Sequence, residues 1–188
     1  MSESILVSPP RDKRRGLVIV NTGDGKGKTT AALGTALRAV GYGWHVLILQ
    51  FIKGTWKYGE MEAIKRLEPE VELVRMGKGF YKILNDNLPE EVHKEAAREA
   101  LAFAREQMHS GKYDLIILDE INVALQTGLL DVKDVLTLLD ERPAGLHLIL
   151  TGRGAPPEIV ERADMVTEMR EVKHPYQQGI KAQRGIDY

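Results

Sequence analysis

Short apolar runs rich in valine, isoleucine and leucine recur along the chain, and each ends in glycine or polar residues. Between them lie segments in which apolar residues return every three or four positions, the spacing of one helix face. The apolar runs predict strands at residues 17–20, 45–51, 71–76, 113–120, 147–150 and 165–169. The periodic segments predict helices at residues 31–40, 60–67, 89–109, 131–140 and 156–163.

Strands and helices therefore alternate from residue 17 onward. This order predicts one α/β domain over residues 16–188, a three-layer αβα sandwich with a mainly parallel sheet. The near-continuous apolar run at residues 45–51 supports this prediction, because a parallel strand is covered on both faces. In the helix at residues 31–40 we expect Leu33, Leu37 and Val40 to face the sheet.

Residues 1–15 precede this domain and are polar and basic, with two prolines followed by three arginines and a lysine. Such a composition is typical of a flexible arm. Its positive charge would also suit an arm that becomes ordered over an anionic ligand such as a triphosphate. The sequence leaves both interpretations open.

The composition narrows the class of function. The chain has 188 residues and a net charge of −1, so no overall positive field favours nucleic acid as a partner. No apolar run approaches the length of a membrane span, and no signal peptide is expected. Cysteine is absent, which excludes disulfides, thiolate metal sites and thiol redox chemistry. A cytoplasmic protein is the expectation that follows.

The turn after the first predicted strand is rich in glycine. It reads Thr22-Gly23-Asp24-Gly25-Lys26-Gly27-Lys28-Thr29-Thr30, and its end opens the first predicted helix. Glycines allow successive backbone N–H groups to point at an anion, and a helix N-terminus adds its positive dipole end. Strand, glycine-rich turn, Gly-Lys-Thr and helix in this order are typical of a phosphate-binding P-loop. We therefore expect residues 22–30 to bind the phosphates of a nucleotide.

Within this P-loop, Lys28 is expected to supply a point charge to the phosphates and Thr29 a hydroxyl to Mg²⁺. The spacing departs from the usual pattern, because Thr22 stands where the first glycine is normally found. Counted from Gly23, the loop is one residue shorter than usual.

Two further strand ends carry candidate chemistry. The predicted strand at residues 113–120 ends in Asp119-Glu120, an acidic pair of the kind that holds Mg²⁺ directly or through water. The strand at residues 147–150 is followed by a glycine turn with Arg153, which is either a solvated side chain or a cation beside the phosphates. With the P-loop, these features predict a P-loop NTPase-like (RecA-like) fold that binds ATP.

Aromatic residues stand in two glycine-flanked loops. Trp56 follows the strand at residues 45–51, and Phe80 and Tyr81 follow the strand at residues 71–76. Carboxyl ends of strands in open α/β sheets are where ligands bind, so these rings are candidates for a lid over a flat ligand. Packing against the body of the protein is the alternative, and the sequence does not decide between them.

These residues together resemble the P-loop ATP:corrinoid adenosyltransferases. The resemblance runs from about residue 16 to residue 188. It rests on the P-loop, on Phe51-Ile52-Lys53-Gly54, on Leu118-Asp119-Glu120, on Leu150-Thr151-Gly152-Arg153-Gly154, and on the tail segments at residues 172–176 and 179–188. The short P-loop and the tail are the most specific of these.

The resemblance implies an enzyme that moves the 5′-deoxyadenosyl group of ATP to the cobalt of a reduced corrinoid, cob(I)alamin or cob(I)yrinic acid a,c-diamide, with triphosphate as leaving group. It also implies Mg²⁺, a homodimer, and an external reduced flavoprotein as electron donor. ATP is expected to bind in the reverse of the usual P-loop orientation. By position, Lys28 neutralises the triphosphate, while Thr29 and Glu120 hold Mg²⁺ with Asp119 behind them.

The same resemblance gives Phe80 a catalytic role. An aromatic residue at its position displaces the lower axial ligand of the corrinoid, which makes Co(II) easier to reduce. Some members carry tryptophan two positions later, where this chain has Lys82. Tyr81 is then the candidate for the second ring.

Two other functions fit a P-loop. An ATPase or kinase would act at the γ-phosphate, and Glu120 beside Asp119 resembles the water-activating glutamate of such enzymes. A non-catalytic nucleotide switch is the other alternative, although no Asn-Lys-x-Asp string for reading guanine is present.

Overall fold

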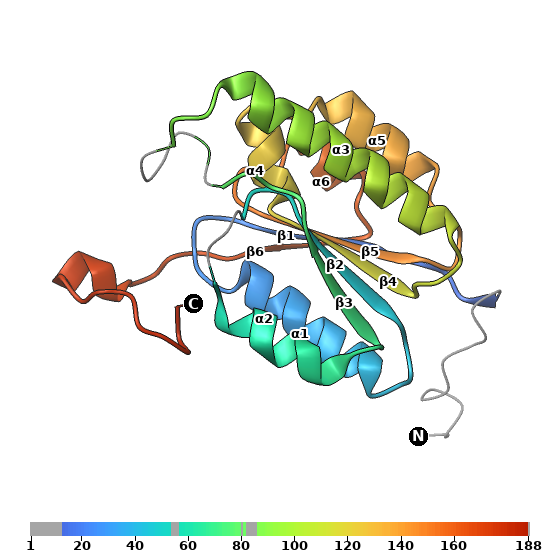
Figure 1. The fold of residues 1–188 in the computed structure, drawn as a ribbon, viewed down its shortest axis with the longest axis horizontal. Coiled ribbons are helices and arrows are strands. Elements are labelled where there is room, and N and C mark those ends of the chain that lie inside the picture. Colours follow the sequence, from blue (N-terminus) through green and yellow to red (C-terminus); the bar gives the residue numbers. More distant parts are fainter. Residues whose placement is uncertain (1–12, 54–56, 80, 82–85, 188) are drawn as a thin grey trace.

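A computed structural model describes residues 13–53, 57–79, 81 and 86–187. Its strands are β1 (Val18–Thr22), β2 (Val46–Gln50), β3 (Val71–Arg75), β4 (Leu115–Asp119), β5 (His147–Thr151) and β6 (Met165–Glu168). They form a single sheet in the order β3-β2-β4-β5-β1-β6, and every pairing is parallel (Figure 1). The predicted α/β fold with a mainly parallel sheet is confirmed.

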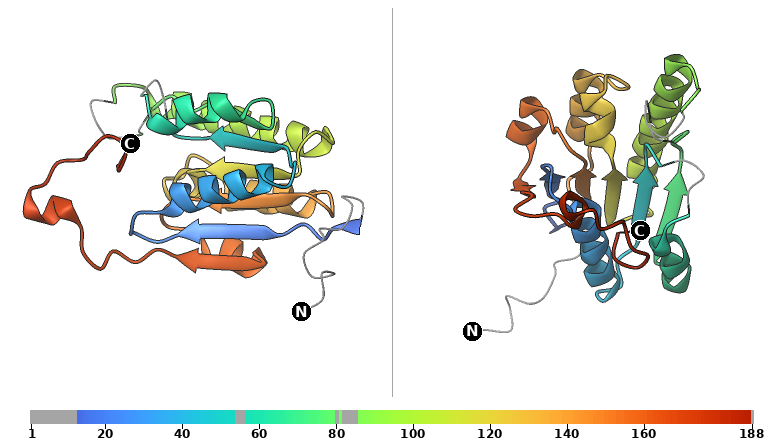
Figure 2. Two further views of the ribbon diagram at one scale, coloured as in Figure 1. Left: turned by 90° about the horizontal axis from the view of Figure 1, so that it is seen from below. Right: turned by 90° about the vertical axis from the view of Figure 1, so that its left-hand side faces the viewer.

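Helices cover both faces of this sheet. They are α1 (Lys28–Val40), α2 (Gly59–Ile64), α3 (Glu90–His109), α4 (Ile121–Gln126), α5 (Val132–Asp140) and α6 (Pro157–Arg162), with 3-10 turns η3 (Lys65–Leu67) and η4 (Pro175–Gln178). Helices α1 and α2 lie on one face, and α3 to α6 lie on the other (Figures 1 and 2). The three-layer prediction is therefore confirmed. Helix α4 was not predicted, because six residues are too few for a helical period to show.

The helices on both faces of the sheet explain why the strands are continuous apolar runs. Alternate residues of the central strands enter two separate cores, so that Leu47 and Leu49 pack on the α3 side while Val46 and Ile48 pack on the α1 side. All five residues of β2 are buried. A strand covered on both faces has no position for a solvated polar side chain, which is why its run is uninterrupted.

The predicted sheet-facing side of α1 is wrong at Leu37, whereas Leu33 and Val40 are partly buried and pack against the core. Ala32, Ala36 and Ala39 are buried against the sheet, whereas Leu37 is 61% exposed. Small side chains allow the helix to lie close to the sheet, and this close approach places the alanine stripe inward. The larger Leu33 is only partly buried at the edge of the same core.

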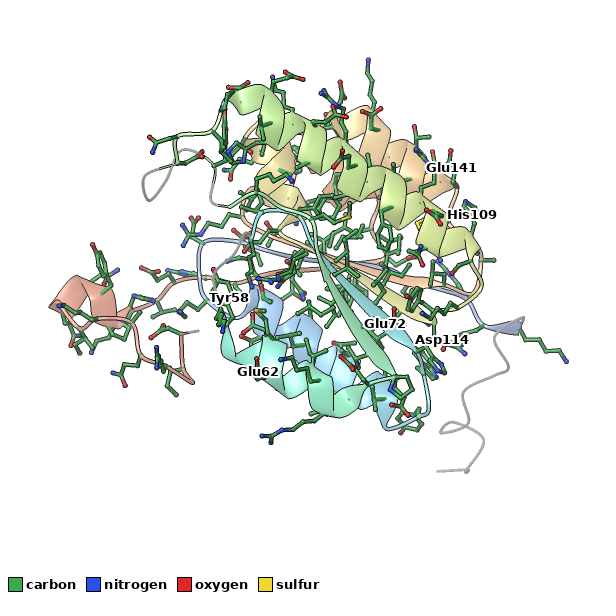
Figure 3. All side chains as sticks on the ribbon, in the orientation of Figure 1. Tyr58, Glu62, Glu72, His109, Asp114 and Glu141 are labelled. Atoms are coloured by element: carbon green, nitrogen blue, oxygen red, sulfur yellow. The ribbon has the colours of Figure 1, made fainter. Side chains whose placement is uncertain are left out.

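Two aromatic rings and the Arg14 guanidinium pack together at the end of the sheet where the strands begin. The Arg14 guanidinium lies 4.0 Å from the centroid of the Trp44 ring, which stacks on His147 at 5.1 Å. Arg14 also pairs with Asp114 at 3.3 Å. Arg15 pairs with Asp164, which lies between α6 and β6. Figure 3 places Asp114 at the end of the sheet opposite Tyr58. The described part of the basic arm thus contacts the body at this end, and the arm boundary at residue 15 stays a prediction.

His147 at this end of the sheet makes the folding stability depend on pH. Its Nδ1 accepts a hydrogen bond from the Leu17 backbone N–H at 3.2 Å, which requires the neutral ring. Burial, and then Arg14 and Arg142, lower the pKa of His147, while Asp114 opposes them. The folded chain therefore binds fewer protons than the unfolded chain just below pH ~6.5, the ordinary histidine value. Stability that is present above that pH is lost as the pH falls toward the folded pKa.

We expect His147→Asn to flatten this dependence, because an asparagine oxygen can accept the Leu17 N–H bond without titrating. Urea unfolding at several pH values between about 5 and 7.5 measures the slope directly. An unchanged slope in the variant would show that His147 is not the group responsible.

Candidate functional site

The P-loop is shaped by the backbone that follows β6. Gly23 and Gly27 have φ angles of 92° and 114°, in the left-handed region that favours glycine. A Cβ atom on Gly23 would lie 2.5 Å from the Met169 carbonyl oxygen, so no side chain fits there. The Gly25 N–H donates to the same oxygen at 2.7 Å. Strand, glycine turn and helix occur in the predicted order, and no side chain caps the N-terminus of α1. The unpaired N–H groups of that helix start are available to an anion.

Lys28 lies directly over this loop. Its Nζ donates to the carbonyl oxygens of Gly23 and Gly25, each at 2.7 Å. Burial, and then the nearby Arg153, lower the pKa of the Lys28 ammonium below its ordinary value. Its hydrogen bonds go to neutral carbonyls, while the nearby Glu120 and Asp24 charges favour the charged form, and an arriving phosphate would stabilise it further.

Asp119 joins the strand tips into one network. Its carboxylate is fully buried and accepts from the hydroxyls of Thr29 and Thr151, each at 2.8 Å, and from Gln50 Nε2 at 3.0 Å. Lys53 Nζ lies 3.3 Å from the second carboxylate oxygen. This network is available because β4 is hydrogen-bonded to β2 on one side and to β5 on the other. Asp119 therefore holds the Thr29 hydroxyl in place.

Glu120 has a different position from its neighbour. Among the described residues it is the only non-glycine residue with a positive φ, 65°, and its N–H donates to the Thr151 hydroxyl at 3.0 Å. Strained backbone of this kind is concentrated at functional sites. Burial, and then the Asp119 charge, raise the pKa of Glu120, while Lys53 and Lys28 oppose them. The strained turn directs this carboxylate into the cavity described next.

A cavity of about 470 Å³ opens beside the P-loop. It is lined by Lys26, Gly27, Lys28, Thr29, Thr30, Leu33, Lys53, Tyr58, Gly59, Glu60, Glu120, Gly185, Ile186 and Asp187. Three lysines and three carboxylates line it, and the lysines together with the N-terminus of α1 could hold a polyanion. Among the described residues, no helix has the length and apolar character needed to cross a membrane.

The donor set of this cavity fits Mg²⁺. The Thr29 hydroxyl and the Glu120 carboxylate both line it, and both are oxygen ligands. The described residues contain no group of three or more His, Cys, Asp or Glu that would enclose a metal ion. Mg²⁺ is usually held by one or two carboxylates together with substrate phosphates and water, so this sparse set is the kind it requires.

The remaining predicted phosphate ligands lie around the loop. Arg153 donates to the Asp24 carbonyl oxygen at 3.2 Å, which places its cation beside the P-loop. The Thr22 hydroxyl accepts from the Ala155 N–H at 3.2 Å and so ties the loop to the turn after β5. Lys26 forms an ion pair with Asp187, which brings the end of the chain to the mouth of the cavity.

Of the three aromatic lid candidates, the structure describes Tyr81. Trp56 and Phe80 lie outside the described residues. Tyr81 is buried in the core, where its ring contacts His93 at 5.2 Å between centroids and its hydroxyl hydrogen-bonds with Glu90. In this structure its side chain therefore packs in the core, and its role as a lid residue stays a prediction.

Sequence reasoning gave no individual role to several residues that line the cavity. Lys53, Tyr58 and Glu60 come from the segment after β2, and residues 185–187 come from the far end of the chain. The position of the first group after a buried parallel strand was the available signal. No local pattern indicated that the tail would reach the P-loop.

The fold is shared with proteins of low sequence identity. The flagellar accessory protein FlaH from Methanocaldococcus jannaschii superposes with a TM-score of 0.55 at 15% identity, over 84% of this chain and 74% of FlaH. The RadB recombinase superposes with a TM-score of 0.52 at 16% identity, over 86% of this chain and 78% of RadB. These likenesses support the P-loop NTPase-like, RecA-like architecture.

Sequence relatives are much closer. The corrinoid adenosyltransferase of Escherichia coli is 45% identical over 93% of this chain and 86% of its own length. Those of Salmonella typhimurium and Pseudomonas aeruginosa are 42% and 40% identical, over 94% and 97% of this chain and 87% and 88% of their own lengths. The family profile described as ATP:corrinoid adenosyltransferase BtuR/CobO/CobP matches residues 14–188. With its P-loop and acidic strand tip in place, this chain belongs to the ATP:corrinoid adenosyltransferase family.

Proposed function

We propose that this chain transfers the 5′-deoxyadenosyl group of ATP to the cobalt of a reduced corrinoid and releases triphosphate. The observation that carries the proposal is the cavity beside the P-loop, lined by Lys26, Lys28 and Lys53, in a chain of the corrinoid adenosyltransferase family. Both substrates, ATP and the corrinoid, follow from the family. The acceptor is cob(I)alamin or cob(I)yrinic acid a,c-diamide, in synthesis or salvage of the adenosylated cofactor.

The reaction needs charge stabilisation more than proton transfer. The Co(I) electron pair forms the cobalt–carbon bond at C5′, the C5′–O5′ bond breaks, and its electron pair leaves on the triphosphate. Lys28 and the N-terminus of α1 are placed to stabilise that growing negative charge. Co(I) is already a strong nucleophile and needs no general base, and no histidine is among the described residues that line the cavity.

Mg²⁺ belongs to the same proposal. Thr29 and Glu120 would hold it, and it would supply further positive charge to the departing triphosphate. Asp119 would keep the Thr29 hydroxyl oriented through its 2.8 Å hydrogen bond. For C5′ to face the corrinoid, we propose that the nucleotide binds with its terminal phosphate in the P-loop, in the reverse of the usual orientation, and that the short loop helps this reversal.

The wider setting is proposed from family membership. We propose a homodimer in the cytoplasm that receives electrons from a reduced flavoprotein, because cysteine is absent and the protein has no thiol redox centre of its own. The net charge of −1 favours no nucleic-acid partner.

Product analysis tests the function. Protein, ATP, Mg²⁺ and chemically reduced cobalamin are expected to yield a light-sensitive cobalt–carbon product and intact triphosphate. The competing candidate is hydrolysis or transfer at the γ-phosphate, favoured by the position of Glu120 after the acidic strand tip. ADP and phosphate without a cobalt–carbon product would establish that alternative.

Phe80 gives a second test through its role in Co(II) reduction, although it lies outside the described residues. We expect Phe80→Ala to slow adenosylation when Co(II) must be reduced on the enzyme, and to spare transfer from pre-formed Co(I). The two assays are run side by side with the same protein. Equal losses in both would remove the proposed role in reduction.

A further inference from the structure

Lys53 is a buried cation to which the proposed reaction assigns no role so far. It follows β2, only 8% of its surface is exposed, and it lines the same cavity as Lys28 and Thr29. Buried lysines are rare in proteins, because removing an ammonium group from water is costly unless it is paired. The contacts of its Nζ therefore indicate why it is there.

Two carboxylates hold this ammonium. Lys53 Nζ lies 3.2 Å from Glu60 Oε1 and 3.3 Å from Asp119 Oδ2, and the Tyr58 ring centroid is 4.7 Å away. Burial opposes its charge, but Asp119 and Glu60 outweigh that effect and raise the pKa of Lys53. The group is therefore a full cation at neutral pH, fixed in the wall of the cavity.

The position of Asp119 places Lys53 beside the P-loop. One oxygen of that carboxylate accepts from Thr29 at 2.8 Å, and the other faces Lys53 at 3.3 Å. A single carboxylate thus separates the Thr29 hydroxyl from the Lys53 ammonium. If Lys53 turned into the cavity, Asp119 would keep three neutral donors, from Thr29, Thr151 and Gln50.

The cavity wall next to Lys53 contains a hydroxyl group without a hydrogen-bond partner among the described residues. The Tyr58 hydroxyl is buried and makes no hydrogen bond to any described residue. Burying a hydroxyl without a partner is unfavourable, so a polar group is expected to reach this part of the wall. Figure 3 shows Tyr58 at the end of the sheet where the P-loop lies.

We propose that Lys53 is a second cation of the triphosphate site, which exchanges its contact with Glu60 for the phosphate oxygens as ATP binds and as the triphosphate leaves. This inference rests on the proposed function. In the transfer step, the C5′–O5′ electron pair moves onto the triphosphate, and Lys53 donates a hydrogen bond to it without giving up its proton. Lys28 acts at the P-loop carbonyls, and Lys53 acts from the part of the wall that holds Tyr58 and Glu60.

Inorganic triphosphate is the direct probe, because its binding does not depend on corrinoid chemistry. With calorimetry in the presence of Mg²⁺, we expect Lys53→Met to weaken triphosphate binding about tenfold or more, the size of one charge-assisted hydrogen bond. Lys53→Arg keeps the charge and is expected to recover part of the affinity. Lys65→Met is the matched control, because that lysine is exposed and pairs only with Glu62 among the described carboxylates.

Glu60→Gln separates this role from a structural ion pair. If Lys53 serves the phosphates, removing a carboxylate that competes for its ammonium leaves triphosphate binding at least as tight as in the wild type. If Lys53 only stabilises the fold through Glu60, this variant loses affinity as Lys53→Met does, and the proposal is overturned. Thermal unfolding of each variant confirms that the folded protein is being compared.

Kinetics with saturating pre-formed Co(I) give an independent readout. A cation that acts on the leaving group affects kcat more than KM, and we expect kcat of Lys53→Met to fall about 100-fold. Normal triphosphate binding and normal kcat in Lys53→Met would overturn the inference while the wild type still forms the cobalt–carbon product. Weak triphosphate binding in that variant, with no cobalt–carbon product from the wild type, would support the cation site and refute the proposed function.

Discussion

Lys28→Ala is expected to lower kcat/KM for adenosyl transfer about 1000-fold, the upper range for loss of one preorganised donor at a developing charge. Lys28 is the cation that the structure holds over the P-loop, through two 2.7 Å bonds to glycine carbonyls. Without it, the triphosphate would lose the cation nearest the P-loop backbone, and the other groups around the cavity would have to stabilise its charge. The measurement is the rate of cobalt–carbon bond formation from pre-formed Co(I) at saturating ATP and Mg²⁺.

The fold is expected to survive this change. The change removes two hydrogen bonds to neutral backbone carbonyls, and it breaks no ion pair of Lys28 with a described carboxylate. We expect a melting temperature within about 4 °C of the wild type, equivalent to about 1 kcal/mol for a chain of this size. Lys65→Ala is the matched control and should retain full activity, because its side chain is 61% exposed. Activity in Lys28→Ala close to that control would mean that the P-loop does not hold the triphosphate.

Asp119→Ala is expected to produce the largest loss of stability, about 3 kcal/mol, and to lower the melting temperature by about 10 °C. The carboxylate is fully buried and accepts from Thr29, Thr151 and Gln50, with Lys53 at 3.3 Å. Its removal leaves those donors buried without their acceptor at the tip of β4. Of the two carboxylates that pair with Lys53, Glu60 would remain. Denaturant unfolding measures the change in free energy.

Activity should fall in the same variant, because the Thr29 hydroxyl loses the contact that orients it. Asp131→Ala is the control for removing a structural aspartate. Asp131 caps α5 by accepting from the Lys133 N–H at 2.9 Å, a contact that contributes about 1 kcal/mol and lies outside the cavity lining. If Asp119→Ala costs no more than that helix cap, the buried network is not the support that its geometry indicates.

Much of the fold follows from local patterns. Strand and helix positions follow from hydrophobic periodicity, since each element must bury one face or both regardless of its neighbours. The P-loop follows from glycine spacing, because positive φ at Gly23 and Gly27 is a local requirement. The acidic tip of β4 can likewise be recognised in the sequence as two acidic residues after an apolar run. Asp131 can be recognised as the N-cap of a helix.

Other features depend on which elements are neighbours in space. Leu37 is exposed while Ala32 and Ala36 are buried, because the approach of α1 to the sheet selects small residues. Tyr81 enters the core instead of the cavity, because His93 and Glu90 of α3 lie beside it. The spacing of apolar residues identifies one face of a helix, but it does not show how closely the helix approaches the sheet.

The sequence by itself therefore determined the parallel α/β architecture, the P-loop and the candidate ligands Lys28, Thr29 and Glu120. Only the tertiary structure decided that Asp119 would be enclosed by donors from three other segments, that Lys53 would pair with Asp119 in the cavity wall, and that Asp187 would reach Lys26. The physical reason is sequence separation. A backbone conformation is chosen by adjacent residues, whereas a buried charge is satisfied by whichever strand tips the sheet order brings beside it.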